Sequence, residues 1–377
     1  MKKNLILYAL LIIYLLLNLM LSAKVSFYNE IINPLLWMII CGVAIYLGKD
    51  TSARVKDDVN KTQSLIIVLI IYIIFYFLLG LVFGYQKTPY AKDIFSIIKN
   101  LWAFCGIIFF QEIVRNTMLR IEKKSVVNNI IIIVLFTLAN ISFLNIGVQF
   151  SNVKLAFTYT ASILIPLLIS NCVFTYLSYI GGPKLPIIYR LFVTVPEFVL
   201  PIIPNFDWFM TAILGVVLPL VVFVYLNFIH LKKDERLSKR DRRKYNPIVY
   251  VPTFVIIGVV VCFVMGVFKY QPLAALSGSM SPTFNRGDAV VVKKLTKKEK
   301  DELQKGDIIQ FTSGSKFVIH RIIETSNDVY GNRVFITKGD ANNAKDAGVV
   351  NYDNIIGKVS FIIPYIGYPS VWLNGMI

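Results

Sequence analysis

The chain has 377 residues, of which 56% are apolar, and a formal net charge of +17 at pH 7. The apolar residues form blocks long enough to cross a bilayer, which excludes a soluble globular protein. Much of the excess lysine and arginine lies in short loops beside these blocks, where it orients helices and meets anionic lipid, so we expect no nucleic-acid partner. We interpret the chain as a polytopic membrane protein with a soluble tail.

Hydropathy and flanking residues predict nine membrane-spanning helices. They cover residues 4–22, 31–47, 64–85, 99–114, 126–146, 154–176, 187–204, 207–230 and 248–269. The seventh contains Arg190, Glu197 and three prolines. Two short helices or a re-entrant segment are therefore alternatives to a crossing at this place.

The first predicted span follows Lys2 and Lys3 and ends near Leu21-Ser22-Ala23. This pattern also fits a cleavable signal peptide. Because the apolar core is longer than that of a usual signal peptide, we expect a retained anchor.

Basic residues predict the orientation of the chain. The N-terminus and the loops 48–63 and 231–247 are rich in lysine and arginine, and the positive-inside rule assigns all three to the cytoplasm. This assignment requires an odd number of crossings between about residue 177 and Asp207, which favours counting the seventh span as a crossing. The tail after Tyr270 is then extracytoplasmic.

Glu112 and Arg115 are unusual within the membrane domain, because ionisable groups at membrane depth usually pair or mark a functional site. An ion pair is the simplest interpretation. A transporter or a membrane scaffold is the alternative that these residues and the long bundle raise.

Residues 270–377 differ from the preceding sequence, because short runs rich in β-branched and aromatic residues alternate with Gly, Asn and Asp. Predicted strands cover Ala289–Val292, Asp307–Phe311, Phe317–Ile322, Val334–Thr337 and Ile356–Ile363. A hairpin turn is predicted at residues 330–333, and Thr296–Leu303 fits a short surface helix or a charged loop. We therefore predict a polytopic α-helical membrane domain over 1–247, a transmembrane anchor over 248–269 and a small, mostly β extracytoplasmic domain over 270–377.

The cysteines do not indicate a site in the tail. Cys41, Cys105, Cys172 and Cys262 all fall within predicted spans. The tail therefore has neither a disulfide framework nor a cysteine-rich metal site, and we expect no cofactor and no metal ion.

The tail contains the residue types of an acyl-transfer site. A catalytic serine needs a base, a group that orients the base and donors for the oxyanion. Ser279 follows the last predicted span, and an extended link of about nine residues reaches no more than about 30 Å, which keeps its scissile bond close to the membrane. His320 is the only histidine on that side, because His230 lies at the cytoplasmic end of a span.

Single residues of these types usually have structural roles: a Ser-Gly-Ser run is commonly a turn, and a strand histidine is commonly a packing residue. The joint pattern is more specific. Three blocks, at residues 277–288, 318–323 and 337–343, together resemble type I signal peptidase. A histidine rather than a lysine at the position of the general base points to the ER-type branch, which occurs in eukaryotes, archaea and some Gram-positive bacteria. The resemblance covers about residues 248–377, and the preceding membrane domain departs from the single anchoring span of the familiar ER-type subunit.

The resemblance implies a signal-peptidase-like β fold and a set of site residues. It implies that Ser279 is the nucleophile, that His320 is the general base and that an aspartate orients the imidazole. Asp340 and Asp346 both match acidic positions of the family; we favour Asp346, with Asp340 as a supporting residue or substitute orienter. Ser277 matches the position whose hydroxyl helps the Ser279 backbone N–H to form the oxyanion hole.

The resemblance also implies a serine endopeptidase that removes signal peptides from secretory preproteins, with small residues at the −3 and −1 positions. Expected partners are these preproteins, the lipid bilayer and the secretion machinery. We expect the plasma membrane of a prokaryote, with a cytoplasmic N-terminus and an extracytoplasmic catalytic domain, and the ER membrane is the alternative. Alternative functions are a protease dedicated to a narrow set of surface or membrane proteins, and a non-enzymatic scaffold or transporter with a peptide-binding outer domain.

Overall fold

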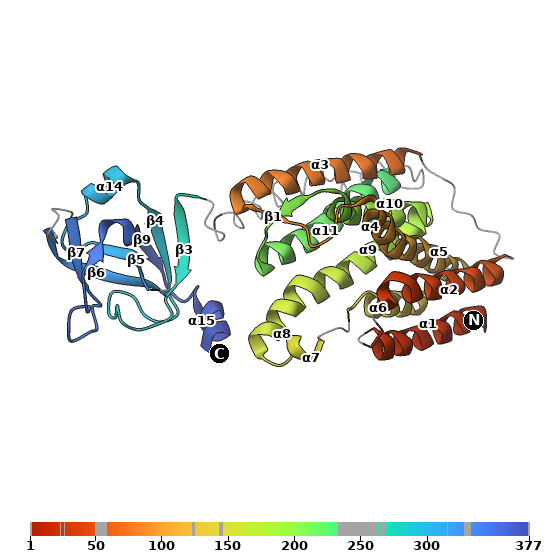
Figure 1. Ribbon diagram of the computed structural model, residues 1–377, viewed down its shortest axis with the longest axis horizontal. Helices are drawn as coiled ribbons and strands as arrows, with labels where there is room; N and C mark the ends of the chain where they lie inside the picture. The colour runs from red at the N-terminus through yellow and green to blue at the C-terminus, as the bar shows by residue number, and fades with distance from the viewer. Residues whose placement is uncertain are drawn as a thin grey trace. The chain divides into compact units, whose positions relative to one another are not determined.

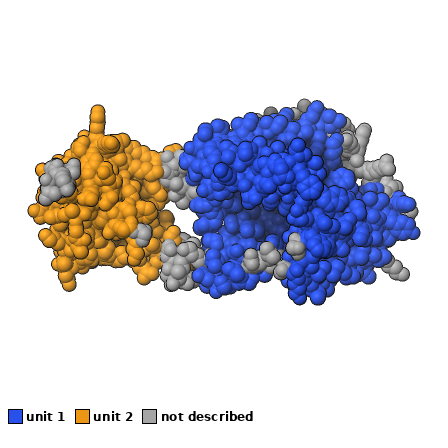
Figure 2. All heavy atoms as spheres, in the orientation of Figure 1, with its two compact units in different colours: residues 1–247 blue, residues 248–377 orange. Residues whose placement is uncertain are grey.

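The computed structural model describes residues 2–22, 24–25, 27–49, 59–122, 125–142, 146–232, 263, 268–314, 316–327 and 333–375. The chain divides into two compact units, residues 1–247 and residues 248–377, which Figure 2 shows in different colours. Most of the predicted anchor 248–269 lies outside the described residues, as do residues 233–247 of the basic loop and residues 330–332 of the predicted hairpin turn.

The N-terminal unit is helical (Figure 1). Its α-helices are α1 (Lys2–Leu21), α2 (Asn33–Gly48), α3 (Val59–Phe83), α4 (Ile94–Asn100), α5 (Gly106–Ile121), α6 (Val126–Ala139), α7 (Ile146–Gln149), α8 (Val153–Tyr159), α9 (Ile165–Gly181), α10 (Lys184–Val199) and α11 (Trp208–Lys232). Short π-helical turns at Tyr28–Ile32, Leu101–Cys105 and Thr160–Leu164 lead directly into α2, α5 and α9.

Among the described residues, 6 helices are long and apolar enough to cross a membrane. They are Lys3–Leu21, Tyr28–Gly48, Val59–Phe83, Ile94–Ile121, Leu155–Gly181 and Trp208–His230. Each corresponds to a predicted span, so the prediction of a polytopic helical membrane domain is confirmed.

Two predicted spans are shorter in the structure than in the prediction. The predicted span 126–146 contains α6, which ends at Ala139 because the side chain of Asn140 turns back and donates a hydrogen bond to the carbonyl of Phe136. The predicted span 187–204 contains α10, whose 16 residues extend about 24 Å, less than the hydrocarbon thickness of about 30 Å. The described residues therefore hold fewer helices of spanning length than predicted.

A small two-stranded sheet follows α10. β2 (Ile202–Pro204) pairs in antiparallel register with β1 (Tyr85–Lys87), which follows α3. The predicted spans 64–85 and 187–204 thus each include residues that form strand rather than helix. The sequence did not predict this pairing, because its residues lie at the ends of apolar runs that resemble helices and the two strands are far apart in the chain.

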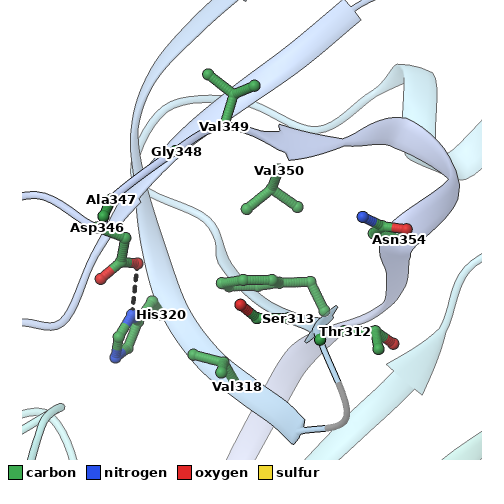
Figure 3. Close-up of a pocket in the computed structure, with 12 residues that line it drawn as sticks. Thr312, Ser313, Val318, His320, Asp346, Ala347, Gly348, Val349, Val350 and Asn354 are labelled. Atoms are coloured by element: carbon green, nitrogen blue, oxygen red, sulfur yellow. Dashed lines mark hydrogen bonds and ion pairs between the residues drawn. The ribbon is translucent and has the colours of Figure 1, made fainter.

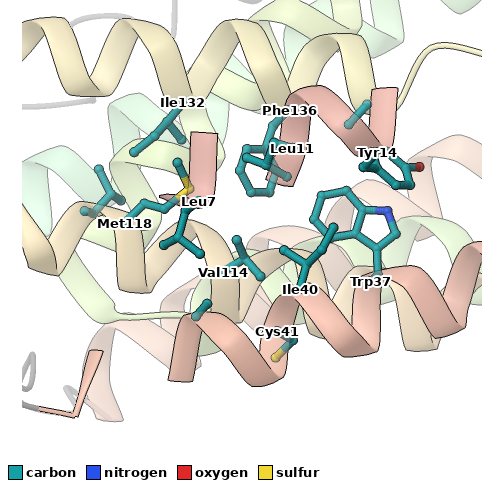
Figure 4. Packing of buried hydrophobic residues seen from close by; sticks show 13 residues of the cluster. Leu7, Leu11, Tyr14, Trp37, Ile40, Cys41, Val114, Met118, Ile132 and Phe136 are labelled. Carbon is teal, nitrogen blue, oxygen red and sulfur yellow. The ribbon is translucent and has the colours of Figure 1, made fainter. Parts of the chain in front are cut away.

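The largest packing cluster of the N-terminal unit joins α1, α2, α5 and α6 (Figure 4). Trp37 is fully buried at its centre, with its ring 4.8 Å from that of Tyr14 and 5.8 Å from that of Phe136. Leu11 lies beside the Phe136 ring, and Met118 belongs to the same cluster. Large aromatic side chains therefore set the spacing of these helices.

A buried ion network joins α5, α9 and α10. Arg115 Nε lies 2.8 Å from Glu112 Oε2, and Arg190 Nη1 lies 2.7 Å from Glu112 Oε1. Arg115 also donates to Asn171 Oδ1 at 2.7 Å and to Thr175 Oγ1 at 3.0 Å. The ion pair predicted for Glu112 and Arg115 is confirmed, and Arg190 is an additional member.

The C-terminal unit contains a seven-stranded antiparallel sheet. Its elements are β3 (Tyr270–Ala274), β4 (Ala289–Lys294), α14 (Lys297–Asp301), β5 (Ile308–Ser313), β6 (Lys316–Asn327), β7 (Arg333–Lys338), β8 (Val350–Asn351), β9 (Ile355–Ile363) and α15 (Tyr368–Gly375). The strand order is β3-β4-β9-β5-β6-β7-β8. The prediction of a mostly β domain is confirmed, and each of the five predicted strands corresponds to an observed one.

Three elements of this unit add to the sequence prediction. β3 and β8 were not predicted; β8 has only 2 residues, too few for an alternating pattern. The segment predicted as a short helix or a charged loop forms α14, because Thr296 and Glu299 make a capping box at its start.

The Glu112 network generates a stability prediction. Glu112→Gln removes the carboxylate that two buried guanidinium groups share, so we expect the free energy of unfolding to fall by about 3–5 kcal/mol. Denaturant unfolding of the full chain in detergent measures this loss. Lys99→Gln is the matched control, because it removes the pair with Glu30, whose partners are 41% and 44% exposed, and it should cost about 0–1 kcal/mol. Equal losses in the two variants would contradict the role given to the buried network.

Candidate active site

Ser279 lies in the turn that connects β3 to β4. The side chains of Met280 and Phe284 are 1% and 4% exposed and pack with Val290 and Val292 of β4. These anchors hold the turn against the sheet, while the Ser279 side chain remains half-buried at its surface. The apolar residues of the motif thus position its serine.

His320 lies in the middle of β6, opposite Ile309 of β5. It is buried, on the face of the strand that also carries Val318 and Ile322. Its ring nitrogen Nε2 is 3.3 Å from Ser279 Oγ. The structure therefore brings together two residues that are 41 positions apart in the chain.

Asp346 completes a line of contacts with these two residues. Its Oδ2 lies 2.6 Å from His320 Nδ1. The hydroxyl of Thr337, a buried residue of β7, donates to the same Oδ2 at 2.7 Å, and the Asp346 backbone N–H donates to the Thr337 carbonyl at 2.9 Å. Thr337 thus fixes both the main chain and the carboxylate of Asp346.

These contacts determine which ring nitrogen of His320 accepts a proton. Because the Nδ1–H donates to the carboxylate of Asp346, Nε2 carries the lone pair that faces Ser279. A neutral imidazole in this tautomer is ready to accept the proton of the Ser279 hydroxyl.

Asp340 makes a different set of contacts. Arg321 donates to its Oδ1 at 2.8 Å and to its Oδ2 at 2.6 Å, and the Thr283 hydroxyl donates to its Oδ2 at 2.5 Å. The hydrogen bonds from Arg321 hold the pKa of Asp340 below its ordinary value. The structure thus ties Asp340 to the turn that carries Ser279 and gives it no hydrogen bond to His320 among the described residues.

The Gly-Asp block also contacts the main chain of Ser279. The backbone N–H of Ala341 donates to the Ser279 carbonyl at 2.9 Å. A Cβ atom at Gly339 would lie 2.7 Å from the same carbonyl oxygen, so a larger residue at this position would displace the serine turn. The close approach explains a glycine beside Asp340.

Ser277 lies next to the nucleophile candidate, and its Oγ is 3.2 Å from Ser279 Oγ. Its side chain is exposed. A hydroxyl at this place can donate to an oxygen that develops negative charge close to Ser279.

A cavity of about 450 Å³ adjoins the histidine and aspartate (Figure 3). His320 and Asp346 form part of its wall, and Phe311, Val318 and Val350 line it together with residues that are mostly polar or small. The histidine and aspartate that contact each other next to Ser279 therefore border a cavity at the surface of the C-terminal unit.

Sequence reasoning gave no role to three side chains that hold this site together. Thr337 positions Asp346, while Arg321 and Thr283 bind Asp340. All three lie within the quoted sequence blocks. Their presence in the same sequence blocks as the predicted site residues indicates that they lie near the site. Which partners they contact depends on strand register.

Residues 248–328 match the family model for signal peptidase, peptidase S26. The matched segment contains Ser279 and His320, and both aspartates follow it. The matched segment of the C-terminal unit is thus similar to this family.

Signal peptidase I W of Bacillus subtilis is 40% identical over 90 residues, which are 24% of this chain and 46% of that protein. The human signal peptidase complex catalytic subunit SEC11C is 30% identical over 111 residues, which are 27% of this chain and 56% of that protein. The chain thus spans about half the length of these curated relatives. The similarities confirm the resemblance of the C-terminal unit to type I signal peptidases of the ER-type branch.

The lowered pKa of Asp340 predicts a local dependence of stability on pH. A carboxylate whose pKa is lower in the folded than in the unfolded chain stabilises the fold above its unfolded pKa, and this contribution is lost as the pH falls through its folded pKa. We therefore expect hydrogen-exchange protection of residues 339–346 to exceed that of the Asp340→Asn variant at neutral pH and to approach it on acidification. The same pH dependence in both proteins would show that the Arg321 contact is not responsible.

Proposed function

We propose that the protein is a membrane-bound serine endopeptidase that removes signal peptides from secretory preproteins. The observation that carries this proposal is the line of contacts from Ser279 Oγ through both ring nitrogens of His320 to Asp346. Similarity to signal peptidases of Bacillus subtilis and of the human signal peptidase complex supports the substrate class.

The reaction begins with proton transfer. His320 Nε2 takes the hydroxyl proton of Ser279 while Oγ attacks the scissile carbonyl. The carboxylate of Asp346 stabilises the imidazolium that forms, since Nδ1 already donates to it at 2.6 Å. The imidazolium then gives its proton to the leaving amine, and the peptide bond breaks.

The oxyanion needs donors at the same place. The backbone N–H of Ser279 and the hydroxyl of Ser277 are the proposed donors, and one such donor typically contributes about 2.7–4 kcal/mol of transition-state stabilisation. The mature chain leaves as the amine. Water then attacks the acyl-enzyme with His320 again as base, which releases the signal peptide as a carboxylate and restores Ser279.

Asp346 and Asp340 have separate roles in this mechanism. Asp346 orients the base. Asp340, with Arg321 and Thr283, positions the turn that carries Ser279. Asp340 is thus a positioning residue rather than a substitute for Asp346.

The membrane setting follows from the distribution of charge and apolar helices. We propose a cytoplasmic N-terminus and an extracytoplasmic catalytic domain in the plasma membrane of a prokaryote, because basic residues concentrate in the loops 48–63 and 231–247. A substrate whose apolar helix lies in the bilayer then presents its cleavage site close to Ser279. The lipid bilayer and the secretion machinery are the corresponding partners.

A narrower substrate range is the second candidate. The matches to known signal peptidases cover 24% and 27% of this chain, so the helical unit of residues 1–247 is an addition whose surface could select particular surface or membrane proteins. Cleavage of several unrelated preproteins distinguishes a general from a dedicated enzyme.

Ser279→Ala tests the proposed activity. The purified full chain, reconstituted in lipid vesicles, is incubated with a model preprotein, and the new N-terminus is sequenced. We expect cleavage after a small residue by the wild type and a loss on the order of 10⁶-fold in the variant. Ser326→Ala, at the exposed end of β6, is the matched control and should cleave as the wild type does. Equal cleavage by Ser279→Ala and wild type would show that another protease cleaves the preprotein and would contradict the role of Ser279, whereas no cleavage by either would favour the scaffold or transporter interpretation.

Asp346→Asn and Asp340→Asn separate the two aspartates. We expect Asp346→Asn to lower kcat by on the order of 10³–10⁴-fold, because an amide at this position favours the wrong tautomer of His320. Asp340→Asn should lower kcat by about tenfold or less, because it weakens only the support of the serine turn. Measuring kcat and KM for both variants on the same preprotein decides between them, and the reverse order of losses would assign the orienting role to Asp340.

A further inference from the structure

A cavity of about 340 Å³ with polar and apolar lining residues lies within the N-terminal unit. It is distinct from the proposed catalytic site and shares no residue with it. Side chains of α1, the start of α2, α5, the end of α6 and α10 line it, among them Asn18, Asn33, Gln111, Asn140 and Arg190. Its volume falls within the range of about 300–1,000 Å³ that is common for ligand pockets.

The wall of this cavity carries positive charge. Among the described residues that line it, Arg190 carries a charge and none is an aspartate or a glutamate. Arg190 shares the carboxylate of Glu112 with Arg115, so two guanidinium groups face one negative charge. The excess positive charge lies beside the cavity, and the Arg190 side chain is 13% exposed.

Side-chain amides line the cavity beside Arg190. Asn18 and Asn33 both belong to its wall, and each amide offers donors and an acceptor. A ligand that fits therefore combines an anionic group for Arg190 with a hydroxyl group that these amides bind.

We propose that this cavity binds a hydroxyl-bearing phosphate ester. The planar donors of an arginine match phosphate oxygens, and the amides of Asn18 and Asn33 offer donors and acceptors to a hydroxyl of the ester. The same chemistry occurs in the headgroup of a glycerol phospholipid and in free glycerol phosphate.

The neighbouring surface is compatible with the lipid source. Met20 and Ile31 flank the cavity residues in sequence and are 60% and 50% exposed. Apolar side chains at these positions offer contact to acyl chains. The experiment therefore tests the phospholipid headgroup and the free phosphate ester separately.

The test uses the full chain in phosphatidylcholine nanodiscs, in phosphatidylcholine nanodiscs that contain phosphatidylglycerol, and in phosphatidylcholine nanodiscs with free glycerol phosphate. The readouts are the thermal unfolding midpoint and, by mass spectrometry, the lipid that remains bound after detergent extraction. Ligand binding to the folded state raises the midpoint with concentration.

Two variants address the cavity and one serves as control. Arg190→Gln removes the charge but leaves the pair of Arg115 and Glu112 in balance, and Thr194→Phe fills the cavity without touching that network. Lys87→Gln removes one exposed charge of β1. We expect the wild type and Lys87→Gln to share a ligand-dependent shift, whereas both cavity variants need about tenfold or more ligand, the loss expected for one charge-assisted hydrogen bond.

A shift with phosphatidylglycerol alone identifies the lipid headgroup, and a shift with glycerol phosphate identifies a free phosphate ester; each supports the proposal. Equal shifts in all four proteins would reveal general attraction to a basic protein and would overturn it. Absence of any shift in the wild type, together with no enrichment of phosphatidylglycerol over phosphatidylcholine in the extracted protein, would also overturn it.

Discussion

The position of the Asp346 carboxylate is the constraint on which the rest of the site depends. Thr337 and His320 both bind its Oδ2, at 2.7 Å and 2.6 Å. Because Thr337 belongs to β7 and His320 to β6, the pairing of these strands determines whether Nδ1 meets the carboxylate. That contact in turn leaves Nε2 as the acceptor toward Ser279. The chemistry at the serine thus follows from sheet register as much as from the identity of three side chains.

The candidate site residues that the structure brings together could be named from the sequence, but the different contacts of the two aspartates could not. Ser279 and His320 stood out because few serine motifs and only one histidine occur in the tail. Asp340 and Asp346 were both compatible with the sequence pattern. His320 and Arg321 are adjacent in β6, where successive side chains leave on opposite faces; one reaches Asp346 and the other Asp340. Burial and register, which are tertiary properties, separate the two sets of contacts on which the proposed roles depend.

For the fold, too, the sequence predicted the local elements but not the contacts between distant parts of the chain. Hydropathy predicted each helix of spanning length in the described N-terminal unit, and runs of β-branched and aromatic residues bounded by Gly, Asn and Asp predicted the longer strands of the sheet. It did not predict that α6 ends at Ala139, where a side chain caps the helix, or that β1 and β2 pair across more than a hundred residues. The partnership of Arg190 with Glu112 was likewise hidden, because α5 and α10 meet only in the packed bundle. Long-range contacts of this kind leave no local pattern.

Coupling between His320 and Asp346 tests the central claim most directly. The residual cleavage rate of His320→Ala is compared with that of the double variant His320→Ala/Asp346→Asn on one preprotein in lipid vesicles. If Asp346 acts through the imidazole, the second substitution has no further effect once the imidazole is absent, and the two rates are equal. A further drop in the double variant, as large as the loss that Asp346→Asn causes on its own, would show that Asp346 acts independently and would contradict the account.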